Sequence, residues 1–576
     1  MQDKFLEIKH LSVAYRTSDY TTEAIRNINL SLSRGERLGL VGESGSGKTT
    51  TSLAIMGLLS KFAEINGQII FDGVDLRSLD EKTLNLYRWK RIAIVFQNGT
   101  DVLNPLLTVY QQLAEPIEKH MGLKKEQIKA RVMQLLADVG LDTAWADAYP
   151  HQLSGGMRQK VLVAMALSCD PELLIVDEPT TALDAVAKRD IIDLIDRMQR
   201  KNNLAMIVSS HELGTIQKLT DRTMVLYRGS VMELGSTDTV IFNSMHPYSR
   251  GLVNSSTQIN EYRDLWGIPN EKEGAPREGC PFCGRCTQSL PECGKRRPEP
   301  LPVSDDEPDH LVSCVRGGII TVLEGKSICK SYKAGKKVVE ACKSVSISIK
   351  AGEIVSLIGE SGSGKTTLAN IIAGMTDKDK GSVSFMGEEM RDFSAARVFN
   401  GVQITFQDSF SSIDDNFEIY QAIEEPLRLL KLGKKEERRE WVLQALRDVH
   451  LPTEDGFIRK RCFMLSGGQR QRVAIARSLV MQPKLLIADE ISSMLDPSTQ
   501  ANILRLLKGL QNSKGFSMLY ITHDISLARK ISDVVYVMKD GEIVEKGSAL
   551  DVFRYPQAPY TKLLIESSLY EKRAAQ

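Results

Sequence analysis

The sequence has no long hydrophobic segment. No apolar run approaches the roughly 18–20 residues that a membrane-spanning helix needs, and the stretch at 161–167 is typical of a buried helix. The first ten residues carry scattered charges and no apolar centre, which argues against a signal peptide. We therefore expect a globular protein that stays in the cytosol.

An excess of charge of either sign is also absent. The chain of 576 residues has 74 lysines and arginines against 73 aspartates and glutamates, a formal net charge of +1. This balance gives no electrostatic reason to expect a nucleic-acid partner. The length is sufficient for several domains, each with a core of its own.

The sequence does contain an internal repeat. Gly-Glu-Ser-Gly-Ser-Gly-Lys-Thr-Thr at 42–50 recurs letter for letter at 359–367, and Leu-Ser-Gly-Gly at 153–156 recurs at 465–468. Four further pairs keep the same order at a nearly constant offset: Tyr15 and Tyr332, Gln97 and Gln407, Asp177-Glu178 and Asp489-Glu490, and His211 and His523. Such ordered self-similarity predicts a duplicated domain.

A region of different composition separates the two copies. Residues 254–318 are rich in proline and hold five of the nine cysteines. Proline at this density predicts a compact extension and linker without regular helix or strand. We therefore expect a first lobe at 1–253, the extension at 254–318 and a second lobe at 319–576.

Short apolar runs precede the motifs of the first lobe, at 38–41, 173–176 and 205–208. Runs of this kind, alternating with helical stretches, indicate an α/β fold with a largely parallel sheet covered by helices. Ligands in such folds bind beyond the carboxyl ends of the strands. The repeated motifs fall at these positions.

The glycine-rich segment follows a predicted strand and opens a predicted helix. Its glycines let backbone N–H groups turn toward phosphate oxygens, and the helix N-terminus adds positive potential. Lys48 and Lys365 are expected to reach the β- and γ-phosphates of a nucleotide, while Thr49 and Thr366 offer a hydroxyl to Mg²⁺. A single copy could be a turn without a ligand, but two identical copies favour a phosphate site.

Acidic pairs end a later apolar run in each lobe. Asp177 and Asp489 could hold the metal directly or through water. Glu178 and Glu490 follow them and are placed to polarise an attacking water. The alternative is an acid that only caps the next helix.

Two histidines end a further apolar run, His211 in the first copy and His523 in the second. Each could hydrogen-bond the γ-phosphate or orient the water. A single histidine would more often be structural, but the recurrence favours a role in the site.

The ordered set of motifs resembles the ATP-binding-cassette (ABC) family over essentially all of both lobes. The resemblance implies an ATPase with an α/β fold: two ABC-type nucleotide-binding domains, each with a P-loop RecA-like core and a helical subdomain, joined by the Cys/Pro-rich extension. It also implies that the Leu-Ser-Gly-Gly signature of one lobe closes on the ATP of the other, so that Lys48 works with Ser466 and Lys365 with Ser154. Met157 departs from the commoner glutamine after the signature, yet both sites are expected to hydrolyse ATP.

The resemblance assigns site residues in both lobes. The first lobe contributes to ATP binding Tyr15, Gly42, Ser44, Gly45, Gly47, Lys48, Thr49, Thr50, Gln97 and Asp177 for its own nucleotide, and Ser154, Gly155 and Gly156 for that of the second lobe. The second lobe contributes Tyr332, Gly359, Ser361, Gly362, Gly364, Lys365, Thr366, Thr367, Gln407 and Asp489 for its own nucleotide, and Ser466, Gly467 and Gly468 for that of the first lobe. The resemblance implies Mg²⁺ at Thr49, Gln97, Asp177, Thr366, Gln407 and Asp489, and catalysis by Glu178, His211, Glu490 and His523. The two tyrosines would stack on adenine, with a core tyrosine as the alternative.

Three features narrow the branch of the family. The closing segments at 245–250 and 558–562, the glutamine segments at 96–105 and 407–412, and the cysteine-bearing tail at 279–314 resemble ATPases of oligopeptide, dipeptide and nickel importers. This implies a peripheral subunit on the cytoplasmic face of the membrane that energises peptide import. Its partners would be two integral-membrane permease subunits and, through them, a solute-binding protein.

Other functions remain as alternatives. Import of nickel or a metal–chelator complex is the second possibility within the branch. A soluble ribosome-associated double-cassette ATPase is the alternative from another class, although the proline-broken linker and balanced charge argue against it. A drug exporter would normally fuse membrane spans to the cassette.

The cysteines of the extension predict a metal site. Cys280, Cys283, Cys286 and Cys293 have the spacing C-x2-C-x2-C-x6-C, close to runs that bind a [4Fe–4S] cluster. The family resemblance instead implies Cys280, Cys286, Cys293 and Cys314, with Cys283 as an extra thiol. A structural Zn²⁺ and free thiols are the alternatives.

Overall fold

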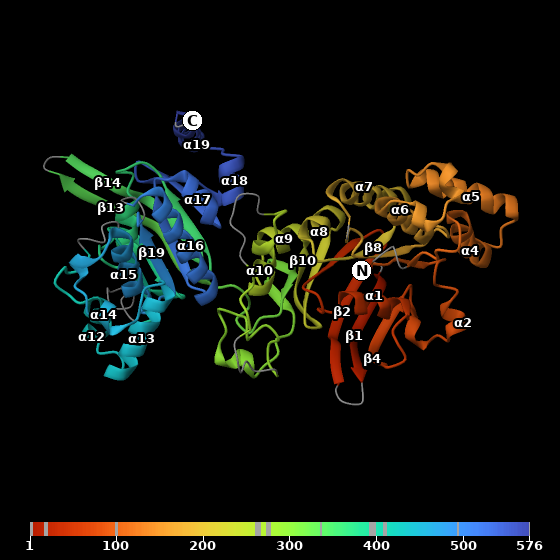
Figure 1. Ribbon diagram of the computed structural model, residues 1–576, viewed down its shortest axis with the longest axis horizontal. Coiled ribbons are helices and arrows are strands. Elements are labelled where there is room, and N and C mark those ends of the chain that lie inside the picture. The colour runs from red at the N-terminus through yellow and green to blue at the C-terminus, as the bar shows by residue number, and fades with distance from the viewer. Residues whose placement is uncertain are drawn as a thin grey trace. The chain divides into compact units, whose positions relative to one another are not determined.

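The computed structural model divides into two compact units, each with one copy of the repeat (Figure 1). The first unit comprises Met1–Ile259, Glu271–Gly284 and Leu290–Gly318, and the second comprises Asn260–Asn270, Arg285–Ser289 and Ile319–Gln576. The structure describes residues 4–16, 21–97, 102–181, 183–259, 267–271, 278–334, 337–390, 399–406, 412–491 and 495–574. None of the helices in these ranges has the length and apolar character required to cross a membrane.

The main sheet of the first unit has eight strands in the order β11-β12-β10-β9-β3-β8-β7-β6. Their bounds are β3 (Arg37–Val41), β6 (Ile92–Val95), β7 (Leu173–Asp177), β8 (Ala205–Ser210), β9 (Arg222–Tyr227), β10 (Ser230–Ser236), β11 (Leu301–Ser304) and β12 (Glu307–Val312). The strands from β9 to β6 run parallel, and the other three are antiparallel. Every residue of β7 and β8 is buried, which explains their continuous apolar runs.

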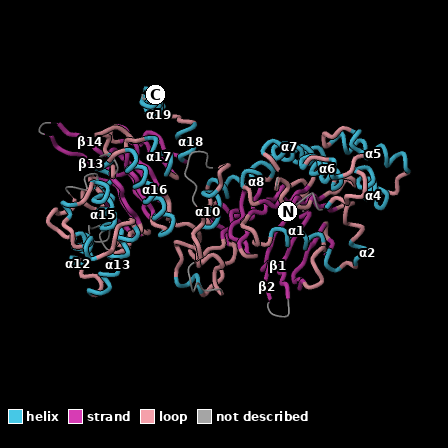
Figure 2. The backbone as a smooth tube through the Cα atoms, viewed as in Figure 1, coloured by secondary structure: helices cyan, strands magenta, loops and turns pink. Residues whose placement is uncertain are grey.

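A second, antiparallel sheet of the first unit has the order β2-β1-β4-β5, and Figure 2 shows its strands β1 and β2 side by side. Its strands are β1 (Lys4–Arg16), β2 (Thr21–Ser33), β4 (Ala63–Phe71) and β5 (Val74–Asp75). The helices are α1 (Lys48–Met56), α2 (Glu81–Leu84), α4 (Val109–Met121), α5 (Lys125–Asp138), α6 (Gly155–Ala166), α7 (Ala185–Asn202), α8 (Leu213–Leu219), α9 (Thr237–Phe242) and α10 (Pro247–Ser255). Helix α1 contacts β2, β6 and β7, so one core joins the two sheets through residues such as Ile8, Ile55 and Ile175. Helices α4 and α5 pack against α6 as a helical subdomain.

The second unit repeats this plan. Its main sheet has the order β18-β19-β20-β15-β21-β22, and its antiparallel sheet the order β14-β13-β16-β17. The strands are β13 (Thr321–Ala334), β14 (Lys337–Lys350), β15 (Ile354–Ile358), β16 (Lys380–Phe385), β17 (Glu388–Glu389), β18 (Val402–Thr405), β19 (Leu485–Asp489), β20 (Ser517–Thr522), β21 (Val534–Lys539) and β22 (Glu542–Ser548). The helices are α11 (Lys365–Ile372), α12 (Ile419–Leu429), α13 (Lys435–Asp448), α14 (Asp455–Ile458), α15 (Gly467–Leu479), α16 (Pro497–Lys514), α17 (Ile525–Ile531), α18 (Ala549–Arg554) and α19 (Pro559–Ala574).

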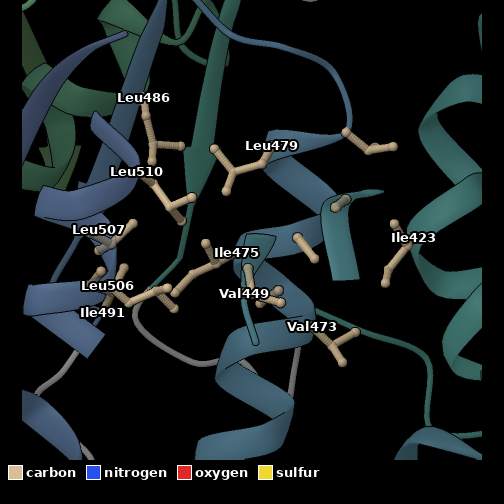
Figure 3. Packing of buried hydrophobic residues seen from close by; sticks show 14 of the residues in the cluster. Ile423, Val449, Val473, Ile475, Leu479, Leu486, Ile491, Leu506, Leu507 and Leu510 are labelled. Atoms are coloured by element: carbon tan, nitrogen blue, oxygen red, sulfur yellow. The ribbon is translucent and has the colours of Figure 1, made fainter. Parts of the chain in front are cut away.

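One core of the second unit ties its helical subdomain to the main sheet. Figure 3 shows Ile423 of α12 and Val473 of α15 in the same cluster as Leu486 of β19 and Leu507 of α16. All four side chains are fully buried. The start of α15 and the carboxyl end of β19, which carry two of the motifs, are therefore held by one packed core.

The extension contains regular structure that the sequence did not predict. Strands β11 and β12 form a hairpin, and β12 pairs with β10 at Glu233↔Val312 and Leu234↔Leu311. The expectation of no strand in this proline-rich region was wrong. Pro302 lies in β11, the last strand of its sheet, which is the kind of strand in which proline is tolerated. β12 pairs with the edge of β10 that β9 does not occupy, and this pairing holds the hairpin in the sheet.

Candidate active sites

In the first unit, the glycine-rich segment forms the loop between β3 and α1, and Lys48 opens the helix. Lys48 is buried, and its Nζ donates to the backbone carbonyls of Gly42 (2.7 Å) and Glu43 (3.2 Å). Burial lowers the pKa of this ammonium, against the opposing effect of carboxylates at the end of β7. Gly47 caps α1 with a φ of 104°, and a Cβ there would lie 2.8 Å from the Ala24 carbonyl oxygen.

The second unit builds the same loop between β15 and α11. Lys365 is buried, and its Nζ donates to the carbonyls of Gly359 and Glu360, both at 2.8 Å. Burial again lowers the pKa of the lysine. The other loop and helix-start residues assigned to ATP lie in these same segments: Ser44, Gly45, Thr49, Thr50, Ser361, Gly362, Gly364, Thr366 and Thr367. In each unit, backbone N–H groups at a helix N-terminus form an arrangement suited to phosphate.

Asp177 ends β7 and Asp489 ends β19, and both are buried. Burial raises the pKa of each carboxyl, while hydrogen bonds with Thr49 and Thr366, respectively, act in the opposite direction. Within the described residues, Oδ1 of each aspartate is buried without a hydrogen-bond partner. A buried carboxylate oxygen left unpaired beside a threonine hydroxyl fits a divalent cation such as Mg²⁺, which prefers oxygen ligands.

Glu178 follows Asp177 and collects three polar contacts on one oxygen. Its Oε2 accepts from Gln97 Nε2 at 2.8 Å and from Thr181 Oγ1 at 3.1 Å, and lies 3.1 Å from Nδ1 of His211. The residue has a left-handed φ of 47°, and its backbone N–H bonds the Ser209 carbonyl at 2.9 Å. The structure thus brings together Gln97, Glu178 and His211.

The second unit has the equivalent pair. Nδ1 of His523 lies 3.3 Å from Oε1 of Glu490, which has a left-handed φ of 45°. The backbone N–H of Glu490 bonds the Ile521 carbonyl at 3.0 Å. Gln407, predicted to complete this site, lies outside the described residues.

The two signature segments are helix starts. Ser154 caps α6, and its Oγ accepts from the backbone N–H of Met157 at 3.3 Å. Ser466 caps α15 in the same way through Gln469, whose side chain also accepts from the serine N–H. Met157 cannot make this second bond, so only the second signature has the reciprocal cap. The glycines that follow (Gly155, Gly156, Gly467 and Gly468) form the first turns of the two helices.

The two candidate adenine-stacking tyrosines have different surroundings. Tyr15, in β1, packs against the core of the first unit. Tyr332, in β13, is 43% exposed, and Nζ of Lys330 lies 5.7 Å from its ring centre. The stacking role stays a prediction for both.

The predicted cysteine ligands are not assembled as a metal site. In the part of the chain that the structure describes, no group of three or more His, Cys, Asp or Glu side chains is arranged to hold a metal ion. Cys286 lies in the segment Arg285–Ser289, which belongs to the second unit. Gln288 of this segment donates to the carbonyl of Ala351 in that unit. The first unit contains the other four: Cys280, Cys283, Cys293 and Cys314. Burial raises the pKa of the Cys280 thiol to about 11, and the other three thiols of that unit add to the rise.

One contact of the first site was missed from the sequence. Thr181 donates to the same oxygen of Glu178 as Gln97 does. Thr181 lies three residues after Glu178, in a turn before α7, and this spacing was the feature of the sequence from which the contact could have been predicted.

Comparisons with known proteins identify the family of the chain. The family model described as ABC transporter matches residues 25–181 and 342–493, and the one described as oligopeptide/dipeptide transporter, C-terminal region, matches 232–293 and 544–576. The chain is 33% identical over 604 residues to the oligopeptide transport ATP-binding protein OppD of Mycobacterium bovis, covering 97% of each chain. It is 35% identical over 579 residues to the glutathione import ATP-binding protein GsiA of Pectobacterium atrosepticum, covering 98% of this chain and 90% of the relative. The protein belongs to the ABC transporter family and carries two of its ATPase cassettes in one polypeptide.

Proposed function

We propose that the protein is the ATP-hydrolysing subunit of an importer for peptides. The observation that carries the proposal is the combination, in one chain, of two ABC transporter segments with two oligopeptide/dipeptide transporter C-terminal segments. Relatives that match nearly the whole chain are named for oligopeptide transport and glutathione import, and both solutes are peptides. Peptides are therefore the proposed solute class, ahead of nickel or a metal–chelator complex.

Each lobe is proposed to bind one ATP at its glycine-rich loop. The loop N–H groups and Lys48 or Lys365 hold the phosphates. Glu178 and Glu490 polarise the attacking water. In the first lobe, three polar groups converge on Oε2 of Glu178 and orient the carboxylate, and Oε1 is the oxygen proposed to accept the proton of the water.

Mg²⁺, when bound, would neutralise charge on the phosphate oxygens. Asp177 and Asp489 are the residues proposed to hold it, with Thr49 and Thr366, because each aspartate keeps one buried oxygen without a hydrogen-bond partner among the described residues. Gln97 is proposed as a further contact of the first lobe.

The signature segments are proposed to complete the opposite sites. Ser154 and the following glycines would act on the ATP held by Lys365, and Ser466 with its glycines on the ATP held by Lys48. Support comes from their form: each is an exposed helix start with a capping serine, which is a site for an anion. ATP would thus draw the two lobes together.

The partners proposed for this movement are two integral-membrane permease subunits and, through them, a solute-binding protein. The chain would sit on the cytoplasmic face of the membrane, because membrane passage belongs to the permeases. No nucleic-acid partner is proposed, in line with the balanced charge.

We further propose that thiols of the extension bind a [4Fe–4S] cluster, with Zn²⁺ as the alternative. The proposed ligands are Cys280, Cys286, Cys293 and Cys314, with Cys283 as the alternate to Cys314. Support comes from N–H groups directed at sulfur: Leu290 N–H donates to Cys293 Sγ at 3.4 Å, and a bond from the Phe282 N–H lowers the pKa of Cys280 against the larger effect of burial. Such bonds stabilise thiolates.

The metal proposal is tested by metal and sulfide analysis of anaerobically purified protein. About four irons per chain, lost in Cys293→Ser, support the cluster. Colourless protein with one zinc supports the alternative, and comparison of Cys314→Ser with Cys283→Ser identifies the fourth ligand.

The transport proposal is tested by purifying the chain with its permeases and binding protein and identifying the co-purifying solute by mass spectrometry. A peptide supports the proposal, and nickel or a metal–chelator complex supports the second solute class. A stable ribosome complex without any permease contradicts the importer function.

A further inference from the structure

The closing segments of both lobes reach back to the glycine-rich loops. In the first lobe, the hydroxyl of Tyr248, on α10, accepts a hydrogen bond of 2.9 Å from the backbone N–H of Glu43. In the second lobe, the hydroxyl of Tyr560, on α19, accepts one of 3.1 Å from the backbone N–H of Glu360. Glu43 and Glu360 are the second residues of the two loop sequences. The contact therefore occurs twice, at equivalent places.

The residue held by each tyrosine is also held by the loop lysine. Lys48 Nζ donates to the carbonyl of Glu43 at 3.2 Å, and Lys365 Nζ donates to the carbonyl of Glu360 at 2.8 Å. The tyrosine thus fixes the N–H of this residue, and the lysine contacts its C=O. Loop N–H groups bind phosphate only while they point inward together. An anchor at the loop entrance restricts the directions that they can take.

The tyrosines are themselves rigidly placed. Tyr248 is fully buried, and Tyr560 is 8% exposed. In the first lobe, the carboxylate of Glu233 in β10 accepts the two backbone N–H groups before α10, at 2.7 and 3.0 Å. In the second lobe, Glu545 of β22 accepts the two equivalent N–H groups before α19, at 2.8 and 3.0 Å. A strand of the main sheet therefore fixes the helix start that carries each tyrosine.

The packing around the two rings differs. The Tyr248 ring lies 4.7 Å from that of Tyr227 and 5.4 Å from that of Phe282, between centroids. Phe282 is buried and stands between Cys280 and Cys283 of the extension. In the second lobe the position of Tyr227 is taken by Lys539, whose Nζ lies 4.8 Å from the centre of the Tyr560 ring. The cysteine-bearing segment therefore touches the tyrosine of the first lobe.

We propose that Tyr248 and Tyr560 are positioning residues that orient the phosphate-binding loops for ATP, and that Phe282 of the cysteine-bearing segment fixes Tyr248. The first ATP site then depends on the extension in a way that the second does not. The inference rests on the proposed assignment of Lys48 and Lys365 to ATP.

The test uses Tyr→Phe variants of the full chain, which remove the hydroxyl and keep the ring. Lys365→Ala removes ATP binding at the second site, so that the first site is measured alone. Lys48→Ala removes ATP binding at the first site, so that the second site is measured alone. Equilibrium binding of ATP is measured in each background, with AMP as a competitor. In the Lys365→Ala background, Tyr248→Phe should weaken ATP binding about three- to tenfold, which is the effect of one lost hydrogen bond. AMP binding should not change, because AMP has no β-phosphate for the loop to hold.

Matched controls separate positioning from folding. Tyr248→Phe in the Lys48→Ala background should leave ATP binding at the second site unchanged, and Tyr560→Phe should show the reverse pattern. Phe282→Leu should weaken ATP binding by about twofold or more at the first site only, since it removes one aromatic contact of the Tyr248 ring. If Tyr248→Phe does not fold, Tyr560→Phe in the Lys48→Ala background tests the same role.

Two results overturn the inference. One is ATP affinity unchanged within twofold in both Tyr→Phe variants. The other is an equal loss of ATP and AMP affinity together with a lower unfolding temperature, which means a structural role only. If the Lys48→Ala, Lys365→Ala double variant binds ATP like the wild type, the proposed nucleotide sites themselves are wrong, which is a separate failure.

Discussion

Replacing Glu178 and Glu490 together by glutamine should abolish ATP hydrolysis while leaving ATP binding intact. In the first lobe, the amide group of glutamine can still face Gln97 and Thr181 with its oxygen, at the positions 2.8 and 3.1 Å away that Oε2 of Glu178 now occupies. The site therefore keeps its shape and loses only the base that takes the proton of the water. Loss of a general base costs about 10²–10⁴ in rate, or about 3–5 kcal/mol in activation free energy.

The assay is phosphate release by the purified chain, with ATP affinity and thermal unfolding measured on the same samples. Glu172→Gln is the matched control, because Glu172 directly precedes β7 and pairs there with Arg34 and Arg91. This control should hydrolyse ATP at the wild-type rate. A double variant that retains more than about one tenth of the wild-type rate would refute the assigned base. The two single variants then show whether the sites act independently.

Three further predictions concern the metal, the extension and the core. Asp489→Asn should raise the Mg²⁺ concentration for half-maximal hydrolysis roughly tenfold or more, and an unchanged Mg²⁺ titration would contradict the metal assignment. Burial lowers the pKa of His310, but its contacts with Glu233 and Glu307 raise it by more, above 6.5. Protonated His310 therefore stabilises the folded state. This stabilisation is complete below pH 6.5 and is lost as the pH rises through the raised pKa of the histidine. His310→Gln should therefore lower the unfolding temperature more at pH 6 than at pH 9. Equal losses at both pH values would show that protonation of His310 does not matter. Leu507→Ala should lower the free energy of unfolding in urea by about 2–5 kcal/mol. Leu563→Ala, at a 58% exposed position, should lower it by less than about 0.5 kcal/mol. Similar losses in the two variants would show that Leu507 is not part of a packed core.

The sequence was sufficient to predict the fold class because its signals are local. The apolar run that forms β7 is buried along its whole length, and the glycine-rich segment that opens α1 is a contiguous motif that recurs letter for letter at 359–367. The hairpin of β11 and β12 could not be predicted in this way. Its prolines argue against strands, and its pairing depends on the free edge of β10, a distant part of the chain.

The sites were predictable as an ordered set of residue types but not as a geometry. Motif order placed Glu178 after a strand, yet its distance from Gln97 depends on β6 and β7 being neighbours in the sheet. The contact of Tyr248 with Glu43 spans 205 residues and has no local signal. The extension was predicted as a metal site from spacing, which does not determine which thiols the fold brings together. The individual roles of the site residues remain predictions.

The two cassettes are proposed to drive peptide import through a membrane partner. The most direct measurement is the ATPase rate of the chain reconstituted with its two permeases in liposomes, with peptide-loaded binding protein added outside. Loaded binding protein should raise the ATPase rate, and labelled peptide should accumulate inside the liposomes, and both effects should be lost in the Glu178→Gln, Glu490→Gln variant. An ATPase rate that does not change with permeases and binding protein, with no peptide accumulation, would contradict the proposed import function.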